Sequence, residues 1–329
     1  MIIKDIIKAH IKEILDIHAK TQNFTHTAEE FCKKFKYKYS DSWRRAVSRY
    51  INSLPDIDAD EALREEAQSI SPARVLIFDI ETAPLMSNIW GLWNQNVGHN
   101  LSMLESDWFI ITWSAKWLFE EEVFTGKLTP EEAKNQDDSR IVRNFWQLLN
   151  DADIVIAHNG DKFDIKRVNT RFLKLGLHPP TPYQTIDTLK HVRKKFNISS
   201  NKLDYVAKFL ELGGKMQTGG FELWKGCMEG DQESLNKMEE YNIKDVTLLE
   251  EVYLRIRSWI TPHPNMGLHI GDNVTCCATC GDTDLTIVGT YKTYMSEYDA
   301  LRCDSCGSIN RSRASSLTTE ARRLLTKSV

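Results

Sequence analysis

The chain of 329 residues has no long apolar run and no large excess of charge. No stretch approaches the 18 or more apolar residues of a membrane-spanning helix. Its start, Met-Ile-Ile-Lys-Asp, is charged and lacks the pattern of a secretory signal. We therefore expect no membrane partner and a cytoplasmic location. Hydrophobic residues make up 41% and charged residues 27%, which is ordinary for folded domains, and the length predicts two or three of them.

Cysteine is also scarce, and its distribution predicts a metal site. Five of the seven cysteines lie between positions 276 and 306, where two Cys-x-x-Cys-Gly motifs are separated by 22 residues. This is the spacing of a Cys₄ zinc ribbon. Disulfides are disfavoured because nothing places the chain in an oxidising compartment. We expect short strands at 285–288 and 291–294, and one structural Zn²⁺ bound by Cys277, Cys280, Cys303 and Cys306.

Charge is unevenly distributed along the chain, although the formal net charge is only −4. Residues 1–54 contain eleven Lys or Arg and six Asp or Glu, whereas residues 55–70 contain one Arg and six acids. The tail beyond Cys306 has five basic residues and one acid, Glu320. Both ends are therefore basic, a distribution that favours contact with a phosphate backbone.

Two acids end the first apolar run of the middle region, Val75-Leu76-Ile77-Phe78-Asp79-Ile80-Glu81-Thr82. Positions i and i+2 of a strand point to the same face, so the carboxylates of Asp79 and Glu81 converge at the end of a predicted strand. Like charges that close repel each other unless a cation lies between them. Taken alone, the pattern is more often that of acids that cap the next helix or face water.

Two further groups of polar residues strengthen the metal interpretation. A short apolar strand at 153–157 runs into His158-Asn159-Gly160-Asp161-Lys162-Phe163-Asp164, and a helix follows. Asp164 then lies in the first turn of that helix. Tyr241 and Asp245 are four residues apart in a long amphipathic helix, so they share a face. Three separate segments thus supply carboxylates that one fold could bring together.

These segments resemble the three motifs of the DEDD exonucleases, in the subclass whose third motif is Tyr-x-x-x-Asp. The match consists of Phe-Asp-Ile-Glu-Thr at 78–82, His-Asn-Gly-x-x-Phe-Asp at 158–164 and Tyr-Asn-x-x-Asp at 241–245. The resemblance covers residues 74 to about 260. It extends to exonuclease domains related to family-B polymerases and to phage-encoded stand-alone enzymes. It implies an α/β fold of the RNase H-like type, with a mixed five-stranded sheet flanked by helices.

The resemblance also implies a mechanism and a set of site residues. Two Mg²⁺ or Mn²⁺ ions hydrolyse the phosphodiester bond in this family. On the family's pattern, Asp79 bridges the ions, Glu81 and Asp245 complete one of them, and Asp164 holds the other through water. Tyr241 orients the attacking water, since a phenol with a pKa near 10 is a poor base at neutral pH. Candidates for binding the terminal nucleotide are Thr82 through its backbone, Asn159, and Phe163 through its ring.

The leading hypothesis for function is a 3′-to-5′ exonuclease on DNA, with a role in replication, repair or nucleotide recycling. An RNA exonuclease is the first alternative, because two-metal hydrolysis attacks the phosphate and need not recognise the sugar. A catalytically silent nucleic-acid-binding protein is the second, although the five-residue set is intact.

The regions outside the nuclease motifs complete the predicted domain organisation. Helical periodicity at 6–17, 27–31 and 42–51 predicts three short helices, typical of either a helix-turn-helix module or a generic three-helix bundle. We therefore expect a helical module at 1–54, an acidic linker at 55–70, the exonuclease domain at 71–262 and a zinc ribbon with basic tail at 263–329. The helical module or the ribbon could also bind a protein partner.

Overall fold

The computed structural model describes residues 6–7, 10–21, 23–51, 73–91, 93, 98, 101–214, 219–270 and 274–327. The described chain forms two compact units. One runs from Arg74 to Thr261, and the other contains the described residues on both sides of that segment. The predicted acidic linker at 55–70 lies outside the described residues, and the finer division into four parts stays a prediction.

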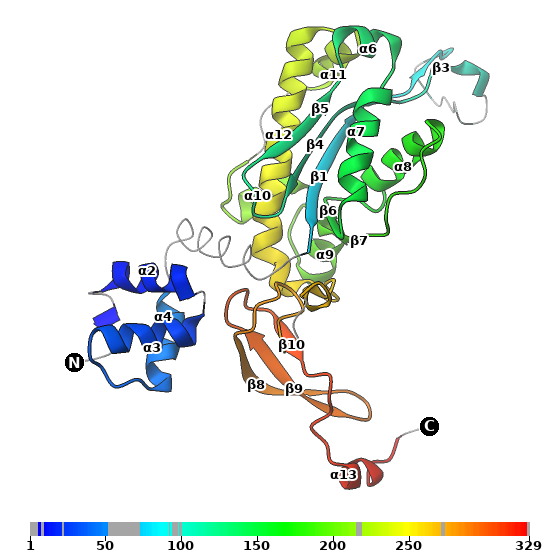
Figure 1. The fold of residues 1–329 in the computed structure, drawn as a ribbon. Coiled ribbons are helices and arrows are strands. Elements are labelled where there is room, and N and C mark those ends of the chain that lie inside the picture. Colours follow the sequence, from blue (N-terminus) through cyan, green and yellow to red (C-terminus); the bar gives the residue numbers. More distant parts are fainter. Residues whose placement is uncertain are drawn as a thin grey trace. The chain divides into compact units, whose positions relative to one another are not determined.

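A mixed five-stranded sheet forms the centre of the unit from Arg74 to Thr261. Its spatial order is β5-β4-β1-β6-β7, in which β1 is antiparallel to β4 and parallel to β6 (Figure 1). Both faces of β1 are covered, which explains why its sequence is a continuous apolar run until its last residues. The strands are β1 (Val75–Thr82), β4 (Ile110–Trp117), β5 (Val123–Lys127), β6 (Ile154–Ala157) and β7 (Gln184–Asp187).

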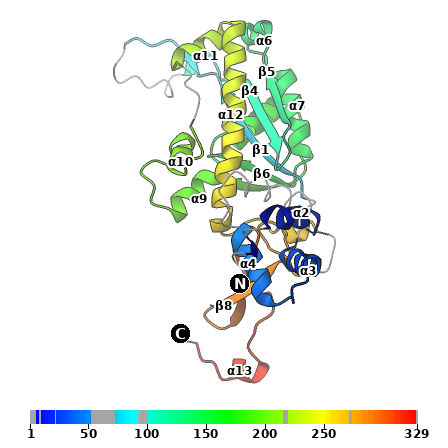
Figure 2. The ribbon, with the colours of Figure 1, turned by 90° about the vertical axis from the view of Figure 1, so that its left-hand side faces the viewer.

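Helices cover the two faces of this sheet. The long helix α12 (Gln232–Ile256) crosses one face over β4, β1 and β5, and α7 (Ser139–Asn150) packs on the other (Figures 1 and 2). The predicted α/β fold with a mixed five-stranded sheet is confirmed. The other helices are α6 (Pro130–Asn135), α8 (Asp164–Lys174), α9 (Thr188–Lys195), α10 (Leu203–Phe209), α11 (Phe221–Met228) and the short η3 (Arg257–Trp259). A separate two-stranded sheet follows β1 in the chain. It consists of β2 (Met86–Ser87) and β3 (Leu104–Ser106), with η2 (Leu101–Met103) before β3.

A buried ion pair attaches α12 to the sheet. Lys116 in β4 pairs with Glu250, which also accepts a hydrogen bond from the backbone N–H of Phe119 at 2.9 Å. Both charged side chains are almost completely buried. Removing one partner of such a pair leaves an uncompensated buried charge. The pair therefore fixes where α12 lies on the sheet, and with it the residues that α12 presents to β1.

The second unit contains three helices near the N-terminus, α2 (Ile11–Thr21), α3 (Phe24–Lys34) and α4 (Asp41–Ile51). Their apolar faces meet in a core that includes Phe24, Phe31 and Trp43. The predicted start of the middle helix at Thr27 was wrong. Asn23 is the N-cap, because its side chain accepts hydrogen bonds from the backbone N–H groups of residues 25 and 26, so the helix begins one turn earlier.

The same unit contains a three-stranded sheet of order β10-β9-β8. Its strands are β8 (Leu285–Lys292), β9 (Glu297–Cys303) and β10 (Ile309–Arg311), with η4 (Met266–Leu268) before them and α13 (Thr319–Arg323) after them. The prediction of two short strands broken at Gly289 was wrong, because β8 continues through Gly289 with a register shift. Arg44 in α4 pairs with Asp304 at 3.1 Å. None of the helices in the described parts of the chain is long and apolar enough to cross a membrane.

Candidate functional site

Strand β1 presents Asp79 and Glu81 on one face of the sheet. Alternation along the strand puts Phe78 on the other face, where its ring lies 5.1 Å from that of Phe145 in α7. Asp79 and Glu81 therefore point toward the face that α12 covers. Both are partly exposed, whereas the residues before them in β1 are buried. The strand thus ends in two acids at the border between the core and solvent.

Helix α12 completes a cluster of three carboxylates. One ligand oxygen each from Asp79, Glu81 and Asp245 lies within 4.8 Å of the others. Asn242, one turn before Asp245, is fully buried and donates from Nδ2 to Oδ2 of Asp79 at 2.7 Å. This hydrogen bond links two segments 163 residues apart and fixes the orientation of the Asp79 carboxylate.

Asp164 lies beside this cluster but outside the group of three. Strand β6 pairs with β1 only from Val75 to Ile77, and further along β1 the backbone N–H of Ile80 hydrogen-bonds to the Asp164 carboxylate instead. The pKa of Asp164 is raised to about 7, chiefly by burial and also by the negative charge of Asp187, against the lowering effect of the backbone N–H groups of Asp164 and Ile80. A nearby cation would favour the charged form of this desolvated carboxyl.

The donor set suits a hard divalent cation. Carboxylate oxygens are the ligands that Mg²⁺ and Mn²⁺ prefer in proteins. Three of them converge here at a distance that would cost electrostatic energy without a counter-charge. Asp164, with a pKa raised by burial, adds a fourth acid next to β1. These residues therefore fit divalent metal ions, and the four acids are the ones that the sequence motifs predicted.

Tyr241 lies on α12 one turn before Asp245. Its ring is partly buried against the core and meets the ring of Trp224 in α11 edge to face, with 6.5 Å between the centroids. Such aromatic pairs favour one ring orientation. Trp224 therefore helps to fix the phenol on the side of α12 that carries the carboxylate of Asp245.

The three predicted nucleotide-binding residues have different surroundings. Thr82 is the last residue of β1 and is partly exposed. Asn159 has a φ of 72°, and its backbone N–H donates to Oδ1 of Asp187 at 3.0 Å, so its backbone shapes the turn before α8. The ring of Phe163 packs against the core, and the guanidinium of Arg167 lies 4.9 Å from its centre. Their role in nucleotide binding stays a prediction.

Sequence reasoning missed Asn242 and two charged residues next to Asp164. Asp187 caps α9 and acts electrostatically on Asp164, and its Oδ2 is buried without a hydrogen-bond partner among the described residues. Arg167 stacks on Trp108 with 4.2 Å between the guanidinium carbon and the ring centre. Asn242 was visible as the second residue of the third motif, but nothing local marked it as a partner of Asp79.

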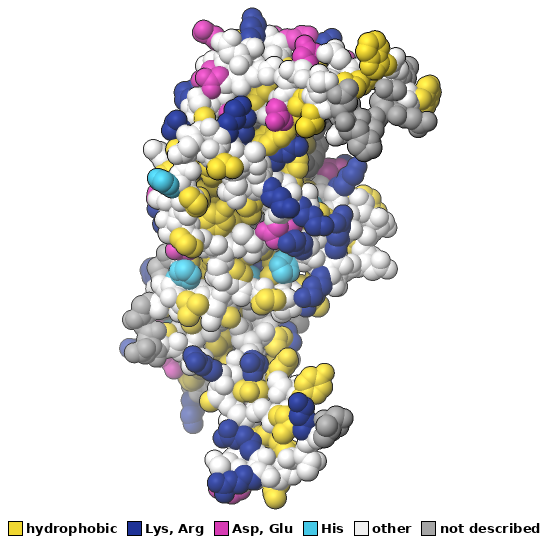
Figure 3. Space-filling view, turned by 90° about the vertical axis from the view of Figure 1, so that its right-hand side faces the viewer, with side chains coloured by type: hydrophobic (Ala, Val, Ile, Leu, Met, Phe, Trp, Pro, Cys, Tyr) yellow, Lys and Arg dark blue, Asp and Glu magenta, His cyan; other side chains and the backbone are white. Residues whose placement is uncertain are grey.

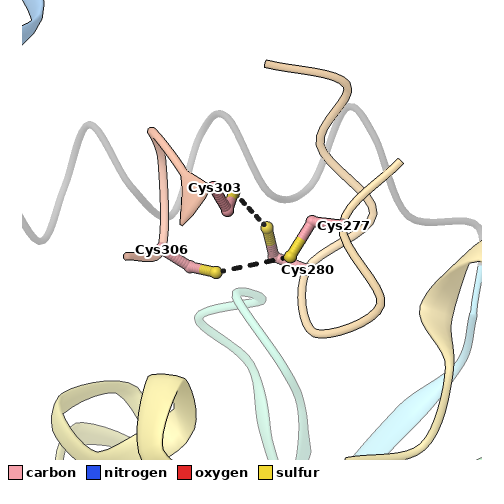
Figure 4. Close-up of side chains that lie close together, drawn as sticks. All are labelled: Cys277, Cys280, Cys303 and Cys306. Atoms are coloured by element: carbon pink, nitrogen blue, oxygen red, sulfur yellow. Dashed lines mark hydrogen bonds between the residues drawn. The ribbon is translucent and has the colours of Figure 1, made fainter. Parts of the chain in front are cut away.

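The cysteine cluster lies in the second unit. Figure 4 shows Cys277, Cys280, Cys303 and Cys306 with their sulfur atoms directed toward one another. The sulfur atoms of Cys277 and Cys306 are 3.6 Å apart, those of Cys280 and Cys303 are 3.5 Å apart, and all four lie within 4.8 Å. All seven cysteines are free thiols. The cluster is compatible with the predicted Cys₄ zinc ribbon.

The two cysteine motifs fold into similar turns. In each, the glycine after the second cysteine adopts a positive φ, 86° at Gly281 and 74° at Gly307, which favours glycine at these positions. Its N–H donates to the carbonyl of the first cysteine, at 2.9 Å in the first motif and 3.0 Å in the second. Hydrogen bonds from the neighbouring thiols hold the pKa of Cys277 well below its usual value. A cluster of thiols in which one readily ionises suits a thiophilic cation such as Zn²⁺.

Comparison with known proteins supports the predicted superfamily. Residues 107–257 match the family model described as the RNase_H superfamily. A DNA polymerase III PolC-type protein of Ureaplasma parvum is 25% identical over 203 residues, which is 61% of this chain and 14% of that protein. The chain thus spans only a small part of this relative's length. The predicted resemblance to the RNase H-like superfamily is confirmed at this level.

The family B DNA polymerase of the archaeon Pyrobaculum calidifontis aligns with 57% of this chain and 25% of its own. The aligned residues are 18% identical, and the TM-score is 0.43.

Proposed function

We propose that this chain, which contains an RNase H-like superfamily domain, is a metal-dependent exonuclease that removes nucleotides from the 3′ end of DNA. The observation that carries the proposal is the cluster of Asp79, Glu81 and Asp245. Asp245 lies one turn after Tyr241 on α12, within the residues that match the superfamily model. Similarity to a PolC-type DNA polymerase supports a nuclease related to proofreading domains and favours DNA over RNA. Replication, repair and nucleotide recycling are the processes in which such an activity would serve.

The acids of the site would bind the metal ions, and Tyr241 would act on the water. Asp79, Glu81 and Asp245 would hold one divalent ion and Asp164 would help to hold a second. When bound, these ions would supply an activated water and neutralise charge on the phosphate. Tyr241 would orient that water through its hydroxyl.

The proposal is tested with end-labelled single- and double-stranded DNA and RNA, incubated with Mg²⁺, Mn²⁺ or EDTA. We expect mononucleotides from the 3′ end of DNA with either metal and none with EDTA. A phosphorothioate linkage at the 3′ end should slow the reaction, whereas one at the 5′ end should not. Equal or faster degradation of RNA would contradict DNA as the preferred substrate, and degradation in EDTA would contradict the metal assignment.

The Tyr241→Phe variant is expected to lose roughly 10²-fold in rate, the lower part of the usual range for a positioned acid–base or orienting group. It removes one hydroxyl and no metal ligand, so Mn²⁺ affinity should change little. Single-turnover kinetics and calorimetric titration with Mn²⁺ measure the two quantities. Tyr205→Phe, at a more exposed position on α10, is the matched control. A fully active Tyr241→Phe enzyme would remove the phenol from the mechanism.

The Asn242→Leu variant is expected to bind Mn²⁺ about 10- to 100-fold more weakly, the usual cost of losing a partner that orients a metal ligand. Leucine keeps the volume but removes the donor to Asp79. Oδ1 of Asn242 is buried without a hydrogen-bond partner among the described residues. The substitution removes this unsatisfied oxygen together with the donor, and this offsets part of the stability lost with the hydrogen bond. Thermal unfolding should therefore change little. Asn236→Leu, on the exposed side of α12, is the control, and an unchanged Mn²⁺ affinity would contradict the role.

The cysteine cluster would bind one structural Zn²⁺, because four thiolate ligands leave no position for substrate. We propose that the ribbon contacts nucleic acid or a protein partner, and the N-terminal helices remain a second candidate for a protein partner. Free thiols persist in reducing compartments, so the cytoplasm stays our predicted location.

A further inference from the structure

Helices α8 and α9 form a strongly basic surface in the unit that contains the acidic cluster. Helix α9 has four Lys or Arg and no acid among its eight residues, and the only acid in α8 is the buried Asp164. Figure 3 shows Lys and Arg side chains gathered in the middle of the face that carries these helices. The α8–α9 basic surface consists of the exposed residues Lys162, Lys166, Lys174, Lys190, Arg193, Lys194 and Lys195.

Most of this charge is not neutralised within the protein. Lys190 pairs with Asp161, and Lys194 donates to the carbonyl of Thr261 at 3.4 Å. The other five residues of the surface have no ion-pair partner in the described parts of the chain. Unpaired cations on one surface repel one another, so an anionic partner would relieve this electrostatic cost.

The helix dipole does not account for this arrangement. A helix C-terminus favours cations, which explains Lys174 and Lys195 at the ends of α8 and α9. The N-terminus favours anions instead. Lys162 lies just before α8 and Lys166 lies in its first turn, where both oppose the dipole. Positive charge at that end therefore costs stability, and its presence indicates a partner outside the helix.

The surface leads to the acidic cluster. Helix α8 begins at Asp164, and α9 is capped by Asp187, whose charge acts on Asp164. Arg167 follows Lys166 in α8, lies over the rings of Trp108 and Phe163, and acts electrostatically on Asp164. Its Nη1 is buried and has no hydrogen-bond partner among the described residues. Positive charge thus continues from the exposed lysines to the residue next to the metal ligands.

We propose that the α8–α9 basic surface binds the phosphate backbone of the strand whose 3′ end enters the metal site. This inference rests on the proposed function. Spaced cations without carboxylate partners suit an extended row of phosphates, each of which releases a counterion when a lysine or arginine contacts it. The surface binds through charge, so it is indifferent to base sequence and its strength falls as salt rises.

The test compares two triple variants of the full chain. The first, Lys166→Gln with Lys174→Gln and Arg193→Gln, removes three charges from the surface. The second, Lys134→Gln with Lys225→Gln and Lys237→Gln, removes three charges from exposed positions on α6, α11 and α12. Fluorescence anisotropy measures the affinity for a single-stranded DNA oligonucleotide with a phosphorothioate 3′ end, between 50 and 200 mM salt. Melting temperatures verify that each variant is folded.

We expect the first variant to bind the oligonucleotide roughly 10- to 100-fold more weakly and its salt slope to fall by about 2, as for three lost phosphate contacts. The second should bind as wild type. The charge-keeping variant Lys166→Arg with Lys174→Arg and Arg193→Lys should restore affinity and slope. Equal affinity and slope in both glutamine variants would overturn the proposal, as would stronger binding of poly-glutamate than of DNA. Hydrolysis of 3′ ends is measured separately. If the first variant hydrolyses DNA and its salt slope is unchanged, the binding surface is wrong and the proposed exonuclease activity stands.

Discussion

The Asp79→Ala variant is expected to lose roughly 10³-fold or more of the exonuclease rate, because removing a central metal ligand forfeits several kcal/mol of transition-state stabilisation. Asp79 is the one acid of the cluster that is both placed by β1 and oriented by Asn242 from α12. Losing it also leaves Glu81 and Asp245 with too few oxygen ligands to hold a cation firmly. Initial rates on a 3′-labelled oligonucleotide in Mg²⁺ and in Mn²⁺ measure the loss, and the affinity for Mn²⁺ should fall with it.

Glu240→Ala is the matched control for this prediction. Glu240 is exposed on the same long helix, directly before Tyr241. It is not one of the three clustered acids, so its removal takes one carboxylate from α12 and leaves the cluster unchanged. We expect its activity to equal that of wild type. Asp79→Asn, which keeps the volume of the side chain, should be as inactive as Asp79→Ala and should melt near the wild-type temperature. Wild-type turnover by either Asp79 variant would rule out the metal site.

The acids of the site follow from signals that are local in sequence. The apolar run of β1 and its two terminal acids obey the two-residue period of a strand, and Tyr241 and Asp245 obey the spacing of a helix face. Each carboxylate is also placed by its own element, and the sheet topology then brings the elements together. The spacing of the three motifs was therefore sufficient to predict the shared acids, whereas the mixed five-stranded sheet was implied by the resemblance that the motifs carry.

Contacts between distant segments had no such signal. Asn242 meets Asp79 only because α12 crosses β1 at one position, which the buried pair of Lys116 and Glu250 helps to set. A mid-helix asparagine is ordinarily a neutral or unfavourable residue, so its burial is visible only in the structure. The same holds for Asp187, which influences Asp164 from the end of a different strand.

The sequence predicted basic regions from the charge counts of chain segments, whereas the α8–α9 basic surface is formed by two helices that folding brings together. The counts for residues 1–54 and for the tail drew attention to the ends of the chain. The lysines and arginines of α8 and α9 lie within residues 162–195, where nine Lys or Arg stand against two acids, but the sequence counts did not single out that segment. Folding places them on one surface beside the acids. The N-terminal helices are a different case, because their helix-turn-helix interpretation depends on a partner and stays a prediction.

Removing the metal from the cysteine cluster is expected to unfold the three-stranded ribbon. Among the described residues, the apolar core there consists of Cys277, Cys280 and Cys303, with only Leu285 and Cys306 packed against it. Most of β8 is exposed. Structural zinc contributes about 10–16 kcal/mol in zinc-finger peptides, as much as the whole folding free energy of an ordinary domain. We expect one Zn²⁺ per chain by metal analysis, and loss of hydrogen-exchange protection in β8 and β9 after chelation or in Cys303→Ser.

Cys276→Ser is the matched control for this prediction, because it removes a thiol that is not one of the four clustered cysteines. Cys276 adjoins Cys277 but lies outside the cluster of four, so this variant should keep its zinc and its ribbon. The unit from Arg74 to Thr261 has its own core and should keep its exchange protection in every cysteine variant, because none of the four ligands belongs to it. If Cys303→Ser stays protected in β9 with no zinc bound, the ribbon takes its stability from packing and the zinc assignment is wrong. Loss of protection both in Cys303→Ser and after chelation of the wild-type protein, together with full protection in Cys276→Ser, assigns the folding energy to the ion, because chelation removes the metal and leaves every side chain in place.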